Sequence, residues 1–264
     1  MQKQQRHNSL RGISIRLIST VCIFLLFPAF SSFSTVRVST VRVSTVQFVA
    51  ADGLEITADE YIVEQGRPYI LLLHEQGSSR GEFKTIARRL CKMNYNCLAV
   101  DLRNGGSDNF VSNETVRQLR EEHAKADVHD IEQDVVAAID YAHEKSNLPV
   151  ILFGSGANAS LALLVALNNE NTRAVVALSP GEYFMPGIKI EDAVAPLKKP
   201  VFITSSKSEF PYVSELASGI DKEYLTLFEP TQGEGRRGTA SFSTAYDQNT
   251  EYWIALILFF KELM

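Results

Sequence analysis

The stretch Phe153-Gly154-Ser155-Gly156-Ala157-Asn158-Ala159-Ser160 joins an apolar run that ends at Phe153 to a helix-like run that begins at Ala157. A tight strand-to-helix turn with small residues around its apex lifts the apex side chain above the carboxyl end of a sheet. Many enzymes present a nucleophile at that apex. Here the apex is Gly156, which keeps the turn and supplies no reactive side chain.

Short apolar runs alternate with amphipathic stretches on both sides of this turn. Such continuous apolar runs are typical of parallel strands that helices cover on both faces. The predicted strands are residues 69–73, 97–102, 150–153, 174–178, 201–204 and 224–228, after two alternating strands at residues 46–50 and 54–63. The predicted helices are residues 82–92, 127–145, 157–168, 211–220 and 249–263. We predict an α/β fold: one doubly wound, mostly parallel sheet of about eight strands with helices on both faces, in a single domain.

Three motifs, each at the end of a predicted strand, resemble those of the α/β-hydrolase superfamily over roughly residues 46–264. His74-Glu75-Gln76-Gly77 stands where that family carries a His-Gly oxyanion-loop motif. Asp101-Leu102-Arg103-Asn104-Gly105-Gly106-Ser107 is similar to its Asp-x-Arg-Gly-x-Gly-x-Ser turn. The third motif is the turn at Gly156, the nucleophile elbow of the family. The likeness is to exported bacterial members of the dienelactone-hydrolase and esterase type, and it implies the α/β-hydrolase fold.

The resemblance implies three catalytic positions, and the sequence departs from the family at two of them. The nucleophile position holds Gly156, and Arg237-Gly238-Thr239 looks like the family's His-Gly-Thr/Ser with arginine in place of histidine. Glycine cannot form a covalent intermediate, and arginine stays protonated and cannot act as a general base. Glu209 stands at the acid position, where we expect either an ion pair with Arg237 or an isolated surface side chain. No histidine follows the turn; the histidines are His7, His74, His123, His129 and His143.

The same resemblance places a ligand pocket above the turn, at the carboxyl ends of the strands. Arg237 in its rim favours an anionic small molecule. Residues 104–126 and 181–200 are the loops most able to cover the pocket. The residues expected to line it are His74, Glu75, Gln76, Arg103, Ser155 and Ala157.

Three functions remain open at this point. The first is a pseudoenzyme, a hydrolase-fold protein that has lost serine-hydrolase catalysis and keeps a small-molecule pocket or an interaction role. The second is an active esterase, lipase or dienelactone hydrolase with a non-standard nucleophile such as Ser155 or Ser160. The third is a structural or protein-interaction module.

The N-terminal residues have the pattern of a secretory signal. Basic residues precede an apolar run from Leu17 to Phe30, and Ala29-Phe30-Ser31 fits a cleavage site. The run is shorter than the roughly 20 residues of a membrane-spanning helix. We predict a signal peptide over residues 1–31 and export to the periplasm or the medium. The alternative is an uncleaved N-terminal anchor, which would be the protein's one association with a membrane.

Three pentads that begin Ser-Thr-Val follow this segment, within residues 34–48. Because the period is odd, successive copies turn their valines to opposite faces of a strand, so that three copies cannot form one amphipathic strand. We therefore predict a repeat-containing linker over residues 32–45 and the domain over residues 46–264, with only the last pentad in the fold.

Composition sets further bounds on function. The chain has 264 residues, 45% hydrophobic content and a formal net charge of −5, which suit one large core and give no reason to expect a nucleic-acid partner. No His-x-x-x-His or Cys-x-x-Cys spacing and no phosphate-cradling motif occurs, so we predict neither a metal nor a cofactor. Cys91 and Cys97 could form a disulfide in an oxidising compartment, or could be two small buried side chains.

Overall fold

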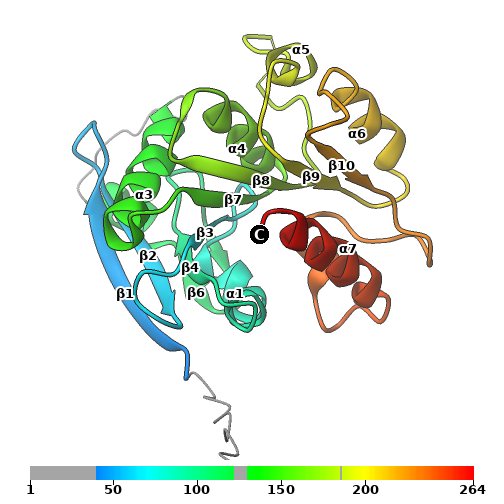
Figure 1. The fold of residues 1–264 in the computed structure, drawn as a ribbon. Helices are drawn as coiled ribbons and strands as arrows, with labels where there is room; N and C mark the ends of the chain where they lie inside the picture. The colour runs from blue at the N-terminus through cyan, green and yellow to red at the C-terminus, as the bar shows by residue number, and fades with distance from the viewer. Residues whose placement is uncertain (1–39, 122–129, 185) are drawn as a thin grey trace, which may run out of the picture. The chain divides into compact units, whose positions relative to one another are not determined.

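The computed structural model describes residues 40–121, 130–184 and 186–264. These residues build an eight-stranded sheet in the order β1-β2-β4-β3-β7-β8-β9-β10 (Figure 1). The first two pairings, β1 with β2 and β2 with β4, are antiparallel, and all the others in the sheet are parallel. The strands are β1 (Arg42–Val49), β2 (Glu55–Ile62), β3 (Tyr69–Leu73), β4 (Asn96–Val100), β7 (Val150–Ser155), β8 (Thr172–Leu178), β9 (Val201–Thr204) and β10 (Leu225–Phe228).

Helices cover both faces of this sheet (Figure 1). One face packs against α1 (Lys84–Cys91) and α7 (Asn249–Glu262), and the other against α3 (Ile131–Ser146), α4 (Ala157–Asn168), α5 (Ile190–Val194) and α6 (Phe210–Leu216). Neighbouring residues of a strand enter opposite cores: Leu72 lies with the α1 and α7 side chains, and Leu71 with those of α3 and α4. The predicted fold class, one α/β domain with a mostly parallel eight-stranded sheet and helices on both faces, is confirmed.

The predicted elements lie within a few residues of those observed, and β3, β9 and α4 coincide with their predictions. The N-terminal boundary was wrong, because β1 begins at Arg42 within the predicted linker and pairs there with Ile62. The five-residue period of the repeat does not prevent this pairing. The first residues of β1 are exposed, so their side chains need not all point to a buried face. The predicted signal peptide and residues 127–129 of one predicted helix lie outside the described residues. Among the described residues, no helix is both long enough and apolar enough to cross a membrane.

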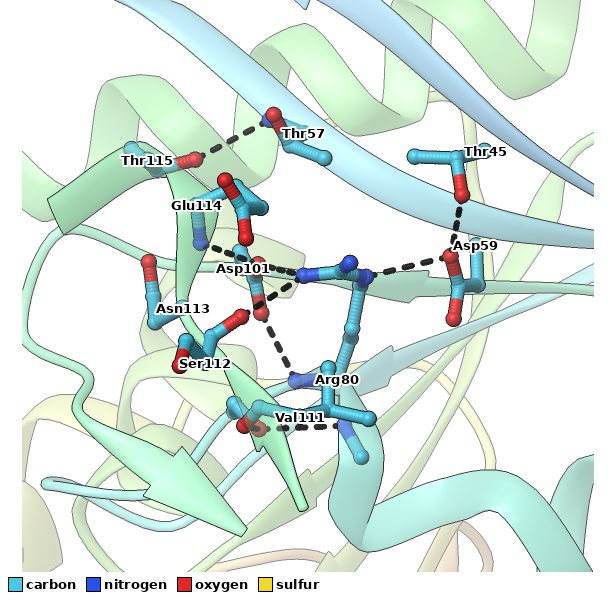
Figure 2. Close-up of polar contacts among 12 residues, drawn as sticks. Thr45, Thr57, Asp59, Arg80, Asp101, Val111, Ser112, Asn113, Glu114 and Thr115 are labelled. Carbon is cyan, nitrogen blue, oxygen red and sulfur yellow. Dashed lines mark hydrogen bonds and ion pairs between the residues drawn. The ribbon is translucent and has the colours of Figure 1, made fainter. Parts of the chain in front are cut away.

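A buried ionic network anchors the segment that follows β4 (Figure 2). Arg80, in the short helix η1 (Arg80–Phe83), forms ion pairs with Asp101 and, at 3.0 Å, with Asp59. Its guanidinium also donates to the carbonyl oxygen of Ser112 at 3.0 Å. Asp101 accepts the backbone N–H groups of Arg80 and Glu114 at 2.8 Å each. These contacts fix the hairpin of β5 (Ser107–Asp108) and β6 (Val111–Ser112) and the start of α2 (Glu114–Glu121) against the sheet.

Cys91 and Cys97 are buried free thiols, so the structure has no disulfide between them. Their sulfur atoms approach backbone carbonyl oxygens instead, at 4.0 Å from Tyr61 and 3.7 Å from Ala87 respectively. Burial raises the pKa of the Cys97 thiol. In the structure, Cys91 and Cys97 are therefore two small buried side chains, the second of the two interpretations of the sequence.

Candidate functional site

The turn at Gly156 has the backbone that the sequence predicts. It connects β7 directly to α4, with φ of 55° and ψ of −123° at Gly156. Its N–H donates to the carbonyl oxygen of Leu178 at 2.9 Å, and its carbonyl oxygen accepts the Ala159 N–H at 3.0 Å. A positive φ is strained for residues with a side chain, so glycine relieves strain that a nucleophile at this apex would have to bear.

The space above Gly156 is filled by the side chain of Glu75, which follows β3. A Cβ atom built on Gly156 would overlap the Glu75 carboxylate. The Ala157 backbone amide is close enough to that carboxylate to lower its pKa, and in the family that the sequence resembles this amide belongs to the oxyanion hole. The Ser155 hydroxyl lies 3.5 Å from Glu75 Oε2. An internal carboxylate therefore occupies the position where a nucleophile and its substrate would meet.

Arg237 holds this carboxylate in place. Its Nη2 lies 3.2 Å from Glu75 Oε1 and donates to the Tyr183 hydroxyl at 2.6 Å, while its Nη1 lies 2.5 Å from Glu209 Oε1. Of the two alternatives that the sequence left open for Glu209, the ion pair with Arg237 is the one present, and Glu75 is an additional partner of Arg237. Glu209 also accepts the hydroxyl of Ser179 at 3.0 Å. Four loops at the carboxyl end of the sheet meet in this cluster.

The pKa shifts show how the two carboxylates differ. Burial raises the pKa of Glu75, and the attraction of Arg237 offsets only part of that rise. Burial also opposes ionisation of Glu209, but hydrogen bonds from Ser206, Arg237 and Ser179 outweigh it and hold the pKa of Glu209 below its usual value. Despite burial, contacts with Tyr183 and the two glutamates raise the pKa of Arg237. Arg237 therefore stays charged and cannot take a proton from a serine.

A second half-buried carboxylate, that of Glu82, supports the loop that carries Glu75. It accepts the Glu75 backbone N–H at 2.8 Å and the Thr239 hydroxyl at 2.7 Å. Burial raises the pKa of Glu82 as well. Because the Glu75 amide is bonded to Glu82, the backbone of the loop after β3 is fixed beneath the carboxylate that covers Gly156.

Two of the predicted ligand-binding residues are structural. His74 is fully buried; its Nε2 accepts the Leu102 N–H at 3.0 Å, and its Nδ1 lies 2.8 Å from the Glu75 carbonyl oxygen. Burial lowers the pKa of His74, which favours the neutral ring that this arrangement requires. The side chain of Arg103 is 1% exposed and is bound to Asp134 and Asp52. Neither side chain can reach a ligand, which corrects both predictions.

The remaining predicted residues lie around two cavities. A cavity of about 390 Å³ opens beside the turn, where Gln76 and Ala157 contribute to its wall. Most of its other lining side chains are apolar: Ile131, Leu161, Leu164, Tyr183, Phe184, Pro186 and Ile188. A more polar cavity of about 370 Å³ is bordered by Glu75, Gln76, Ser155 and Arg237. The sequence missed the apolar wall of the first cavity, although part of it belongs to the loop at residues 181–200 that was expected to cover the pocket.

The two candidate displaced nucleophiles lack a catalytic setting. The buried Ser160 hydroxyl donates to the Gly181 carbonyl oxygen at 2.8 Å and accepts its N–H at 2.9 Å. Ser155 is 1% exposed, and its hydroxyl contacts the carboxylate of Glu75. In the described part of the chain, neither hydroxyl contacts a histidine. Within the same residues, no group of three or more His, Cys, Asp or Glu side chains could hold a metal ion.

Comparisons with known proteins identify the fold. No protein-family profile and no curated protein sequence matches the chain. Among solved structures, the esterase Pf2001 of Pyrococcus furiosus is similar with a TM-score of 0.63 and 16% identity, over 84% of this chain and 90% of that one. A dienelactone hydrolase from Anabaena variabilis matches with a TM-score of 0.59 and 16% identity, over 83% and 95% of the two chains. A dienelactone hydrolase-like promiscuous phosphotriesterase from metagenomic libraries matches with a TM-score of 0.57 and 14% identity, over 84% and 98%. The chain thus has the fold of esterases and dienelactone hydrolases.

Proposed function

We propose that this chain is an exported α/β-hydrolase-fold protein that has lost serine-hydrolase catalysis and binds a small molecule beside the former catalytic turn. The observation that carries the proposal is the Glu75 carboxylate above Gly156, held there by Arg237. A hydrolase of this fold needs that space for its nucleophile and for the carbonyl under attack. Here it is occupied from within the protein, beside a base position that holds a permanently charged arginine.

The cavity of about 390 Å³ is the binding site in this proposal. Its size and mainly apolar wall are typical of small-molecule pockets. The sequence suggested an anionic ligand because of Arg237, but both terminal nitrogens of Arg237 already bond to Glu75, Glu209 and Tyr183. We therefore propose a neutral, mainly apolar ligand, with polar groups that can reach the exposed Gln76 amide at the edge of the cavity.

A fluorophosphonate probe tests the loss of catalysis. The probe reacts with activated serines. We expect no labelling of the purified protein, because among the described residues neither Ser155 nor Ser160 has a histidine partner. Rapid labelling of Ser155 or Ser160, mapped by mass spectrometry, would instead establish an active hydrolase with a displaced nucleophile.

A thermal-shift experiment tests the pocket. A ligand that binds only the native state must raise the melting temperature. We expect hexanol and methyl hexanoate to raise it and hexanoate to have a smaller effect. Leu164→Trp, which fills the cavity, should abolish the shifts, while Leu258→Trp on the exposed side of α7 should not. If none of the three compounds shifts the melting temperature, the binding part of the proposal fails and a structural or interaction role gains support.

The export part of the proposal rests on the N-terminal sequence. Expression in the native host followed by fractionation tests it directly. We expect a chain shortened by about 31 residues outside the cytoplasm, as signal-peptide removal requires. A full-length chain in the membrane fraction would support the anchored alternative, and a full-length chain in the cytoplasm would refute export.

A further inference from the structure

Strand β1 lies at one end of the eight-stranded sheet, and in the described part of the chain no strand pairs with its outer edge. The Ala50 N–H donates to the Leu54 carbonyl oxygen at 2.8 Å, in register with the pairing of β1 and β2. Backbone groups alternate in direction along an antiparallel strand, so those of Val43, Thr45, Gln47 and Val49 point away from β2. The strand contains neither the lysine nor the proline that protects many edge strands. Its outer edge can therefore accept another strand.

A cavity of about 560 Å³ lies beside this edge, between β1 and α3. Its wall includes the apolar side chains of Phe48, Val136 and Tyr141, and the rings of Phe48 and Tyr141 stack with centroids 5.1 Å apart. The polar part of its lining is strongly acidic and consists of Asp130, Glu132, Gln133, Asp140 and Glu144. A complementary partner must combine a positive charge with apolar side chains.

The negative charge of this wall is largely uncompensated. Asp130 lies 3.9 Å from Arg103, at the limit of an ion pair. Glu132, Asp140 and Glu144 form no ion pair with any described residue. The cavity is lined by no lysine or arginine. An arginine supplied by a neighbouring strand would therefore meet unpaired carboxylates.

We propose that β1 pairs antiparallel with β1 of a second copy of this chain, which joins the two sheets in a symmetric dimer. Val46 lies on the two-fold axis in this pairing. Val43 then faces Val49 of the partner subunit, and Arg42 faces Ala50 of the partner subunit. Such a contact uses the same surface on both copies and closes on itself.

In this register the side chains on both faces of β1 gain contacts with the partner subunit. Val43 and Val49 are 43% and 63% exposed in the monomer, and the pairing covers them with each other. Side chains of even-numbered residues share the face that packs toward α3, as Val46 and Phe48 do. Arg42 of the partner subunit therefore enters on that face at the Ala50 end, near Ala51 and Asp130, which both line the acidic cavity. The strand itself thus carries the positive charge that its own cavity lacks.

Sedimentation velocity on the purified protein tests this dimer. We expect a monomer–dimer equilibrium over about 1–100 µM, as for a modest interface. Arg42→Glu should raise the dissociation constant at least about tenfold, because it places a carboxylate among carboxylates. The matched control Arg173→Glu, at an exposed position on β8, should leave it unchanged. Combining Arg42→Glu with Glu132→Lys and Asp140→Lys should restore much of the lost affinity.

A backbone variant tests the strand pairing independently of charge. Gln47→Pro removes an N–H that points outward, a position where an edge strand tolerates proline. We expect it to abolish the dimer with little change in melting temperature; if it lowers the melting temperature, Gln47→Lys replaces it. A wild-type protein that is monomeric at every concentration overturns the proposal. A dimer that persists in both the Arg42→Glu and the Gln47 variants also overturns it, since it must use another surface.

Discussion

The carboxylate of Glu75 lies where a side chain of residue 156 would begin, so that residues 75 and 156 compete for one space above the turn between β7 and α4. The resemblance drawn from the sequence places residue 75 in the oxyanion-loop stretch and residue 156 at the nucleophile position. This chain has the larger side chain at the first position and glycine at the second. In the proposed pseudoenzyme, the absence of a side chain at residue 156 and the position of the Glu75 carboxylate are therefore linked by sterics.

The shared space predicts a strong coupling between substitutions at the two positions. Gly156→Ser alone should lower the free energy of unfolding by about 2–3 kcal/mol, because it combines overpacking with a strained φ. Adding Glu75→Gly should recover at least about 1 kcal/mol, since neighbouring substitutions couple. Urea denaturation measures both values. Gln76→Gly is the matched control, and equal recovery with that substitution would show that Glu75 does not fill the space.

The opposite pKa shifts of Glu75 and Glu209 predict opposite effects on stability. The lowered pKa of Glu209 means that its ionised form stabilises the fold; this contribution is present above the ordinary carboxyl pKa and is lost as pH falls through the lowered one. The raised pKa of Glu75 means that stability declines as pH rises from the ordinary value through the raised one. At pH 7, Glu209→Gln should therefore cost on the order of 1 kcal/mol, after allowance for its partial exposure.

Glu75→Gln should cost nothing at pH 7 and should flatten the decline in stability above the ordinary carboxyl pKa. Denaturation series from pH 3.5 to 7 on the two variants give the comparison. Equal losses in both variants at pH 7 would mean that the Glu75 carboxylate is stabilised rather than strained in the folded state.

Arg80 should be among the arginines most important for stability. Its removal leaves Asp101, which is fully buried, without its cation. Arg80→Met should therefore cost about 3 kcal/mol. Arg117→Met, which breaks two solvent-exposed ion pairs on α2, should leave the free energy of unfolding nearly unchanged. Similar losses in the two variants would indicate that the network in Figure 2 is not a buried anchor.

The thiols of Cys91 and Cys97 should be free and protected. We expect both to react with a thiol reagent only after the protein unfolds, because both are buried. A reducing agent should leave the melting temperature unchanged. A fall in melting temperature on reduction would show that the protein carries the disulfide after all.

Much of the fold could be predicted from the sequence because its signals are local. The continuous apolar runs of β3 and β9 and the turn before α4 give those elements their observed boundaries. The start of β1 could not be predicted from periodicity, because its exposed residues pair with β2 without entering a core. Pairing across 20 residues of chain, as between Arg42 and Ile62, leaves no local signature.

The sequence predicted which residues meet at the site better than it predicted what each of those residues does there. Gly156, Glu209 and Arg237 meet where the motifs place them, because each follows a strand that ends at the same edge of the sheet. Glu75 was expected to contact a ligand, and it is the residue that closes the turn. His74 and Arg103 were assigned to the pocket by their motifs, but their partners Leu102 and Asp134 come from other segments that spacing alone does not reveal.

Ester hydrolysis by the triple variant Glu75→Gly/Gly156→Ser/Arg237→His tests the central claim most directly. These changes empty the space above the turn, restore a nucleophile there and supply a base, and parts of a triad act together. We predict that the wild type and the Gly156→Ser/Arg237→His double variant are inactive on a p-nitrophenyl ester, and that the triple variant is measurably active. Hydrolysis by the wild type, removed by mutation of Ser155, would contradict the account.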